Sequence, residues 1–194
     1  MNLKILSLVI IGVCILLPDV CYAFLEKDVH LLNMQNGLAD NTVSAVYKDK
    51  EGFVWFGTRN GLSRYDGRQI TNFEQSNSYP SISNLKEVFD GVLAFVDNGV
   101  FSAFDLKKER FLSVVSSSEK RIPSWGMLQK NDSLVWVISG SELHLMKRCA
   151  SKEGELRLRV QEKYTGWDNQ DNLLVAITYS SDKKSICLID EKGD

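Results

Sequence analysis

The chain has 194 residues, of which 44% are hydrophobic and 25% are charged, so it is long enough to bury a substantial core. Its formal net charge of −2 gives no electrostatic reason to expect a nucleic acid or an anionic membrane as a partner. The sequence has only two histidines, His30 and His144, and no glycine-rich phosphate-binding loop, so we expect no catalytic residue, no metal and no cofactor.

The first 23 residues have the pattern of a secretory signal peptide. The apolar run 5–17 is too short to cross a bilayer comfortably, and no second apolar segment of spanning length follows. Small residues at Cys21 and Ala23 suit a signal-peptidase site, so we expect cleavage after Ala23 and export to the periplasm. Acylation at Cys21 is the alternative, but Asp19-Val20 fit poorly before a lipidated cysteine.

The segment 43–73 predicts four short antiparallel strands at 43–48, 53–57, 62–65 and 69–73. The turns between them are Lys50-Glu51-Gly52, Asn60-Gly61 and Asp66-Gly67. Gly52 is free to take positive φ, and Asn60-Gly61 predicts a type I′ turn, which needs positive φ at both central residues. Four such strands in order form a meander, the unit of a propeller blade.

This unit recurs at intervals of about 40 residues. Residues 92–105 repeat the apolar run, the Asn-Gly pair and a final aromatic-Asp, 134–145 repeat it with Trp136 at the place of Trp55, and 173–190 form a fourth copy. We therefore expect an all-β protein. Residues 24–194 would form a β-propeller of about four four-stranded blades, as part of a larger and incomplete propeller, with blades at 43–74, 81–115, 122–163 and 167–194.

The first copy closely resembles the two-component regulator propeller repeat. The matching residues run from Gly37-Leu38 through Gly52-Phe53-Val54-Trp55-Phe56-Gly57-Thr58 to Tyr65-Asp66-Gly67, and the likeness is specific over 30–74 and weaker over 81–190. The resemblance implies the periplasmic sensor region of a hybrid histidine kinase that senses a polysaccharide fragment. It also implies downstream sensor and kinase domains, where any kinase activity would reside, and a homodimer at full length.

Ring closure is the next expectation from this resemblance. In propellers of this kind an N-terminal strand often completes the last blade, and 28–33 is the candidate for that strand. Its partner blade would lie beyond residue 194, so we expect a truncated arc whose bare faces and edges make it poorly soluble or oligomeric. A ring of four blades closed by 28–33 is the alternative.

Candidate ligand contacts are aromatic residues outside the strand pattern, namely Tyr79, Trp125 and Trp167. An aromatic face near hydrogen-bonding groups can stack on a sugar, whereas Trp55 and Trp136 lie within strands and are expected to pack in the core. The aspartates beside turns are expected to accept backbone N–H bonds rather than to serve as acids or bases. These are Asp40, Asp49, Asp66 and Asp105.

The alternative function is a free-standing exported propeller, either a carbohydrate-binding protein or a polysaccharide-cleaving enzyme. Such an enzyme would place several convergent carboxylates or a histidine pair at one face of the ring. Cys149 and Cys187 are expected to be thiols on strands, although an oxidising compartment would permit a bridge between them.

Overall fold

The computed structural model describes residues 30–74, 81–116, 121–165, 174–180 and 186–190. The chain divides into two compact units, Met1–Leu32 and Asn33–Asp194. In the first unit, the described residues 30–32 have no regular secondary structure, and the predicted signal peptide lies outside the described residues. No helix in the described ranges is long and apolar enough to cross a membrane.

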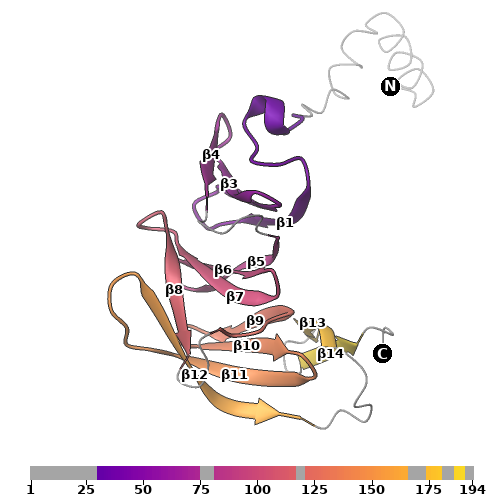
Figure 1. The fold of residues 1–194 in the computed structure, drawn as a ribbon, viewed down its shortest axis with the longest axis vertical. Helices are drawn as coiled ribbons and strands as arrows, with labels where there is room; N and C mark the ends of the chain where they lie inside the picture. Colours follow the sequence, from indigo (N-terminus) through magenta and orange to yellow (C-terminus); the bar gives the residue numbers. More distant parts are fainter. Residues whose placement is uncertain (1–29, 75–80, 117–120, 166–173, 181–185, 191–194) are drawn as a thin grey trace, which may run out of the picture. The chain divides into compact units, whose positions relative to one another are not determined.

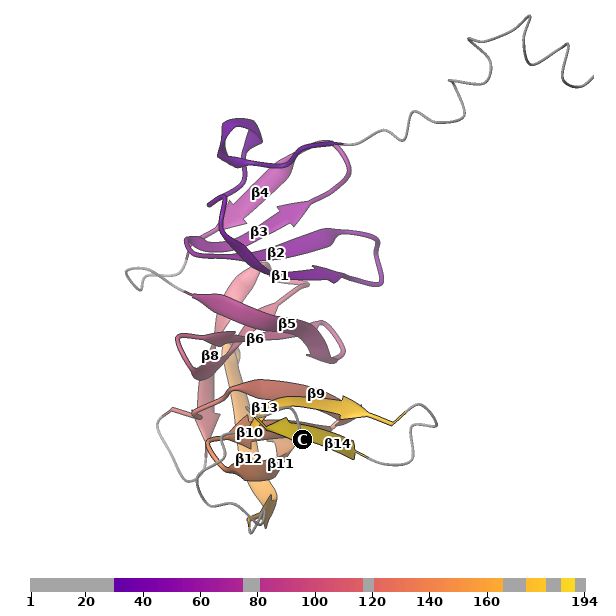
Figure 2. The same ribbon diagram turned by 90° about the vertical axis from the view of Figure 1, so that its right-hand side faces the viewer.

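The first four strands form one antiparallel meander. Their bounds are β1 (Val43–Lys48), β2 (Val54–Thr58), β3 (Gly61–Tyr65) and β4 (Ile70–Phe73), drawn in indigo to purple in Figure 1. They lie in the sheet order β1-β2-β3-β4 (Figure 2). The predicted strands are therefore present, with ends that differ by no more than one residue. Gly52 and Gly67, in the two outer turns, both have a φ of 97°. Short polar turns with glycine thus fold this segment into a blade, as the sequence predicts.

The remaining strands repeat the meander. The second blade consists of β5 (Ile82–Phe89), β6 (Val92–Asp97), β7 (Val100–Asp105) and β8 (Arg110–Ser116). The third consists of β9 (Gly126–Asn131), β10 (Leu134–Ser139), β11 (Glu142–Cys149) and β12 (Glu155–Tyr164). After it, β13 (Leu174–Tyr179) pairs with β14 (Ile186–Asp190) in a two-stranded sheet, at the place of the predicted fourth blade. The first strands of successive blades, β1, β5, β9 and β13, pack in that order (Figure 2). This is the arrangement of a β-propeller.

The two Asn-Gly pairs make different turns. In the β6–β7 hairpin, Asn98 and Gly99 have φ values of 49° and 77°, as a type I′ turn requires. In the β2–β3 hairpin, Thr58 pairs with Gly61, so Arg59 and Asn60 form the loop and only Gly61 has positive φ. The type I′ prediction for Asn60-Gly61 is wrong because the Thr58 hydroxyl fixes another register. It accepts from the Asn60 N–H and donates to the Gly61 carbonyl.

Blades two and three share one continuous sheet. Glu155–Leu158 of β12 pair in parallel with Ser113–Ser116 of β8, which joins eight strands in the order β5-β6-β7-β8-β12-β11-β10-β9. The Ser113 N–H also donates to the Gly154 carbonyl. This link between the last strands of two blades was not predicted, because strand periodicity reports pairing within a hairpin and not between distant edges.

The core fills the spaces between blades. One buried cluster joins Trp55 and Leu62 of blade one to residues of blade two that include Phe104, and another joins blades two and three. Trp55 packs against Phe73 and Phe104, with ring centroids 5.6 and 5.5 Å apart. Both Trp55 and Trp136 are buried, which confirms their predicted packing role.

The segment before blade one does not extend as a strand in its described part. Asn33 caps the 3-10 helix η1 (Met34–Asn36), and residues 30–33 belong to no sheet, while 28–29 lie outside the described residues. In the described part of the chain, β13 packs against β9, whereas neither β13 nor β14 makes a contact of similar extent with β1.

Candidate functional site

Trp125 is the one predicted contact residue that the structure describes; Tyr79 and Trp167 lie outside the described residues. Its side chain is 47% exposed. Its backbone is held on both sides, because its N–H donates to the Ile138 carbonyl (3.0 Å) and its carbonyl accepts from Asn84 Nδ2 (2.7 Å). Asn84 has a φ of 52° at an irregularity in the β5–β6 register, where the extra residue breaks the ladder. The result is an exposed indole on a fixed backbone between blades two and three.

A cleft of about 450 Å³ lies between blades one and two. Trp125 does not line it. The walls come from the β1–β2 turn, the end of β3, the end of β5 and the β7–β8 turn, and Trp55 of β2 also lines the cleft. Five of the lining side chains are carboxylates and three are cationic. The charged members are Asp49, Glu51, Glu87, Asp90, Glu109, Lys50, Arg64 and Lys107.

Glu87 connects the two walls of this cleft. Its side chain, on blade two, is only 8% exposed. Its carboxylate accepts from Lys50 Nζ at 3.2 Å and from the Tyr47 hydroxyl at 3.4 Å, both of blade one, and from the Gly91 N–H at 3.1 Å. Burial, followed by the charge of Glu87, raises the pKa of Tyr47, and the hydrogen bond to Glu87 raises the pKa of Lys50. Both groups, with ordinary pKa values of 10.0 and 10.5, carry their protons at neutral pH and can donate hydrogen bonds to Glu87.

Arg64 forms the second connection. Its guanidinium lies over the rings of Phe53 (4.8 Å to the centroid) and Trp55 (5.6 Å), and its Nη1 is 2.5 Å from Glu109 Oε1 of blade two. Glu109 has a φ of 49° in the β7–β8 turn, a conformation that non-glycine residues rarely adopt. The cation is therefore stacked on aromatic rings on one side and paired with a turn carboxylate of the next blade.

The turn aspartates have the role that the sequence predicts. Asp49 accepts from the backbone N–H groups of Glu51 and Phe53 through Oδ1, and from the Trp55 indole N–H through Oδ2 (2.8 Å). Asp40, Asp66 and Asp105 each accept a backbone N–H two residues further on. These carboxylates are therefore engaged in local structure.

The arrangement suits hydrogen bonding more than acid–base chemistry. The cleft offers both carboxylate acceptors and cationic donors, and several of them are paired with each other. His144 is buried and bonds to Glu142 (2.9 Å), away from the cleft, and Cys149 is a free thiol at the end of β11. No group of three or more His, Cys, Asp or Glu side chains in the described ranges is arranged to hold a metal.

Sequence reasoning missed the cleft, since its walls combine residues far apart in the chain. Lys50 and Glu87 are 37 residues apart, and Arg64 and Glu109 are 45 apart. A signal was available in the repeat itself, because each turn recurs at the same end of every blade. The charged turns of neighbouring blades are therefore brought together.

Residues 37–60 match the family profile described as "Two component regulator propeller". Among solved structures, the chain is similar to the extracellular domain of a proposed one-component system from B. thetaiotaomicron (TM-score 0.62, 15% identity, 84% of this chain and 24% of that chain). It is also similar to the extracellular domain of a proposed hybrid two-component system from the same organism (TM-score 0.55, 15% identity, 84% and 24%).

The virginiamycin B lyase from Staphylococcus aureus has a similar fold (TM-score 0.55, 17% identity, 79% of this chain and 54% of that chain). No curated protein matches the chain. The chain spans about a quarter of the length of the two extracellular domains. These likenesses establish the β-propeller fold and one two-component regulator propeller repeat.

Proposed function

We propose that this β-propeller is the ligand-binding part of the periplasmic sensor of a hybrid two-component signalling protein, and that its ligand is a polysaccharide fragment. The regulator repeat at 37–60 and the likeness to extracellular domains of signalling systems support the sensor role. In this proposal residues 1–23 direct export, and the downstream sensor and kinase domains that act on the signal belong to a longer protein.

The observation that carries the ligand class is the geometry of Trp125. A sugar ring presents an apolar C–H face that stacks on an aromatic side chain, and a fixed aromatic loses little entropy on binding. Trp125 is exposed while its backbone is anchored by Ile138 and Asn84. Tyr79 and Trp167 would supply further aromatic faces.

A binding role fits these features better than catalysis does. The propeller fold also supports enzymes, as the similar lyase illustrates, so the fold alone does not decide the question. In the cleft between blades one and two, Glu87 is paired with Lys50 and Glu109 with Arg64, so these carboxylates are engaged with cations, which favours binding over proton transfer.

The test is calorimetric titration of the purified protein with a panel of neutral and acidic oligosaccharides. For a glycan that binds, Trp125→Ala should weaken the affinity by about three- to tenfold, the value of one aromatic contact. Tyr164→Ala is the matched control, because Tyr164 is also an exposed aromatic but lies at the end of β12. Equal affinity of the Trp125→Ala variant and the parent would contradict the proposed contact, and no binding to any glycan would contradict the ligand class.

A further inference from the structure

A second cleft, of about 260 Å³, lies between blades two and three. The β7–β8 turn contributes residues to both clefts, Glu109 to the first and Lys108 to the second. The second cleft has the opposite charge balance, with four cationic side chains and three carboxylates. They are Lys108, Arg110, Arg148 and Lys152, and Asp105, Glu153 and Glu155.

Two of the three carboxylates are engaged outside this set of cations. Asp105 accepts the backbone N–H groups of Lys107 and Lys108 at 3.0 Å each. Glu155 Oε1 accepts from Arg157 Nε at 3.0 Å, and Arg157 does not line the cleft. Among the carboxylates that line the cleft, Glu153 is thus the one that forms ion pairs with its cations, Lys108 and Arg110.

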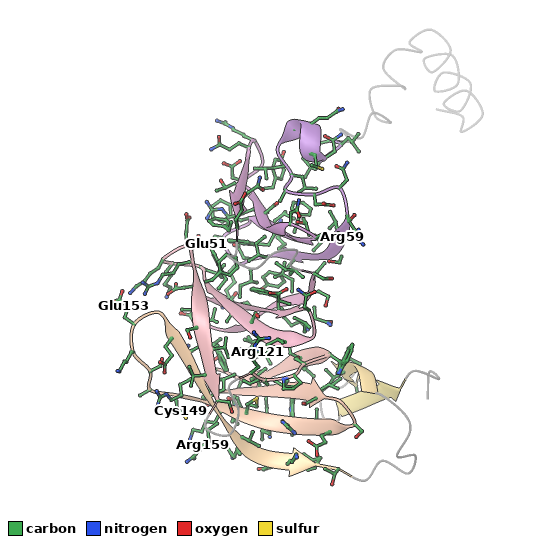
Figure 3. All side chains as sticks on the ribbon, viewed as in Figure 1. Glu51, Arg59, Arg121, Cys149, Glu153 and Arg159 are labelled. Carbon is green, nitrogen blue, oxygen red and sulfur yellow. The ribbon has the colours of Figure 1, made fainter. Side chains whose placement is uncertain are left out.

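Glu153 is a weak counter-ion for this many cations. One oxygen, Oε1, accepts from both Lys108 Nζ (2.7 Å) and Arg110 Nη2 (3.1 Å), and the side chain is 69% exposed. Figure 3 shows Glu153 on the turn between β11 and β12. An exposed pair of this kind contributes little, because water and salt screen it. Breaking the ion pairs of Glu153 with Lys108 and Arg110 should therefore cost little free energy.

The two arginines have unused binding capacity. Arg110 Nε is buried and has no hydrogen-bond partner in the described part of the chain. The Arg148 guanidinium lies over the Phe89 ring, 5.4 Å from the centroid. The pKa of the Asp90 carboxyl is lowered mainly by Lys107 and Lys50, and the charge of Arg148 adds a smaller effect. Among the described residues, however, Arg148 forms no salt bridge within 4.0 Å. Because Arg110 Nε has almost no accessible surface, a ligand would contact this 40% exposed side chain through its terminal nitrogens, one of which, Nη2, is paired with Glu153.

We propose that this cleft, which we term the basic cleft, binds an oxyanion: the carboxylate or sulfate group of an acidic ligand. Arginine presents planar donors that match the oxygens of such groups, and the Phe89 ring holds one guanidinium in place. Arg110 comes from blade two and Arg148 from blade three, so the bound group bridges the two blades beside the β8–β12 ladder. Oxyanion binding displaces Glu153 into solvent. Trp125 does not line the basic cleft, so this site does not depend on the proposed sugar contact.

The experiment is titration of the purified protein with sodium sulfate, methyl glucuronide and neutral methyl glucoside at constant ionic strength, followed by calorimetry and amide chemical shifts. Sulfate or the glucuronide should bind and shift the amides of 108–112 and 148–156, whereas the glucoside should not. Preference for sulfate would assign a sulfated ligand, and preference for the glucuronide a carboxylated one. Absence of binding by both anions would overturn the proposal.

Three single variants test the proposal, because one should weaken oxyanion binding, one should strengthen it and the control should leave it unchanged. Arg148→Gln should weaken binding about fivefold or more, because it removes a cation and its donors. Glu153→Gln should strengthen binding by about two- to fivefold, since it removes a competing partly exposed pair. Arg159→Gln is the matched control, as Arg159 is exposed on the same hairpin and outside the cleft (Figure 3), and it should change the affinity less than twofold.

Binding that is equal in Arg148→Gln, Arg159→Gln and the parent would show that the anion sits elsewhere and would overturn the site. Weaker binding by Glu153→Gln would overturn its role as the displaced counter-ion. Because Trp125 does not line the basic cleft, Trp125→Ala should leave sulfate binding unchanged. Failure of the glycan experiment and failure of this one are therefore separable.

Discussion

Replacing Trp55 with alanine should remove the centre of the contact between blades one and two. The indole is 1% exposed, and it packs between Phe73 and Phe104 while Arg64 lies over its face. Truncating a buried aromatic to alanine costs about 3–5 kcal/mol. The lost N–H bond leaves Asp49 Oδ2 without its donor, which adds about 1 kcal/mol. We therefore expect Trp55→Ala to lower the free energy of unfolding by about 4–6 kcal/mol, much of a typical domain's stability.

Urea unfolding followed by circular dichroism measures this change. Trp55→Phe keeps most of the ring contacts but not the bond to Asp49, so it should cost about 1–2 kcal/mol. Trp125→Ala is the size-matched control, because the same truncation at an exposed site should cost no more than about 0.5 kcal/mol. A decrease of less than about 1 kcal/mol in the free energy of unfolding of Trp55→Ala would refute the conclusion that this side chain stabilises the contact between blades one and two.

Gly57→Ala should destabilise the same contact by about 1–3 kcal/mol in urea unfolding, because a Cβ there would lie 2.7 Å from Ile82 Cγ2 and 3.0 Å from the Ile82 carbonyl oxygen. An Ile82→Ala background removes Cγ2 but keeps the carbonyl oxygen, so the cost should shrink there without vanishing, and an equal cost in both backgrounds would contradict the side-chain clash. Asp97→Asn should alter the pH dependence of stability, since burial raises the pKa of the Asp97 carboxyl while the Ser81 N–H bond opposes that rise. The protonated form is favoured in the folded state, so this contribution is complete below the unfolded pKa and is lost as pH rises through the folded pKa. Relative to the parent, Asp97→Asn should therefore gain stability as pH rises from acid toward neutral, and a pH-independent difference would refute the assignment.

The parts of the fold set by local chemistry could be predicted from the sequence. The strands of blade one, the positive φ of Gly52 and the turn aspartates all follow from residue order within a few positions. The type I′ turn at Asn60-Gly61 could not, because the Thr58 hydroxyl competes for the turn and shifts its register by one residue. The turn type of a two-residue loop therefore depends on such side-chain hydrogen bonds as well as on which residues can take positive φ.

The clefts and the β8–β12 ladder depend on residues that meet only after the blades have formed. Lys108 reaches Glu153 across 45 residues, and no periodicity in either segment marks the other as its partner. Trp125 was identified as outside the strand pattern, and its exposure agrees with that assignment. Its anchoring by Asn84 depends on the irregularity in β5, for which the sequence carries no signal that we recognise.

The β8–β12 ladder has a mechanical consequence. Pulling blade three away from blade two along the strands loads several backbone hydrogen bonds at once, in shear, and these must break together. Blade one is attached to blade two differently, since in the described part of the chain only side chains bridge that joint, through Ser44, Lys50 and Arg64 among others. Those contacts can yield one at a time. Under tension, we expect blade one to part from blade two while blades two and three still move as one body.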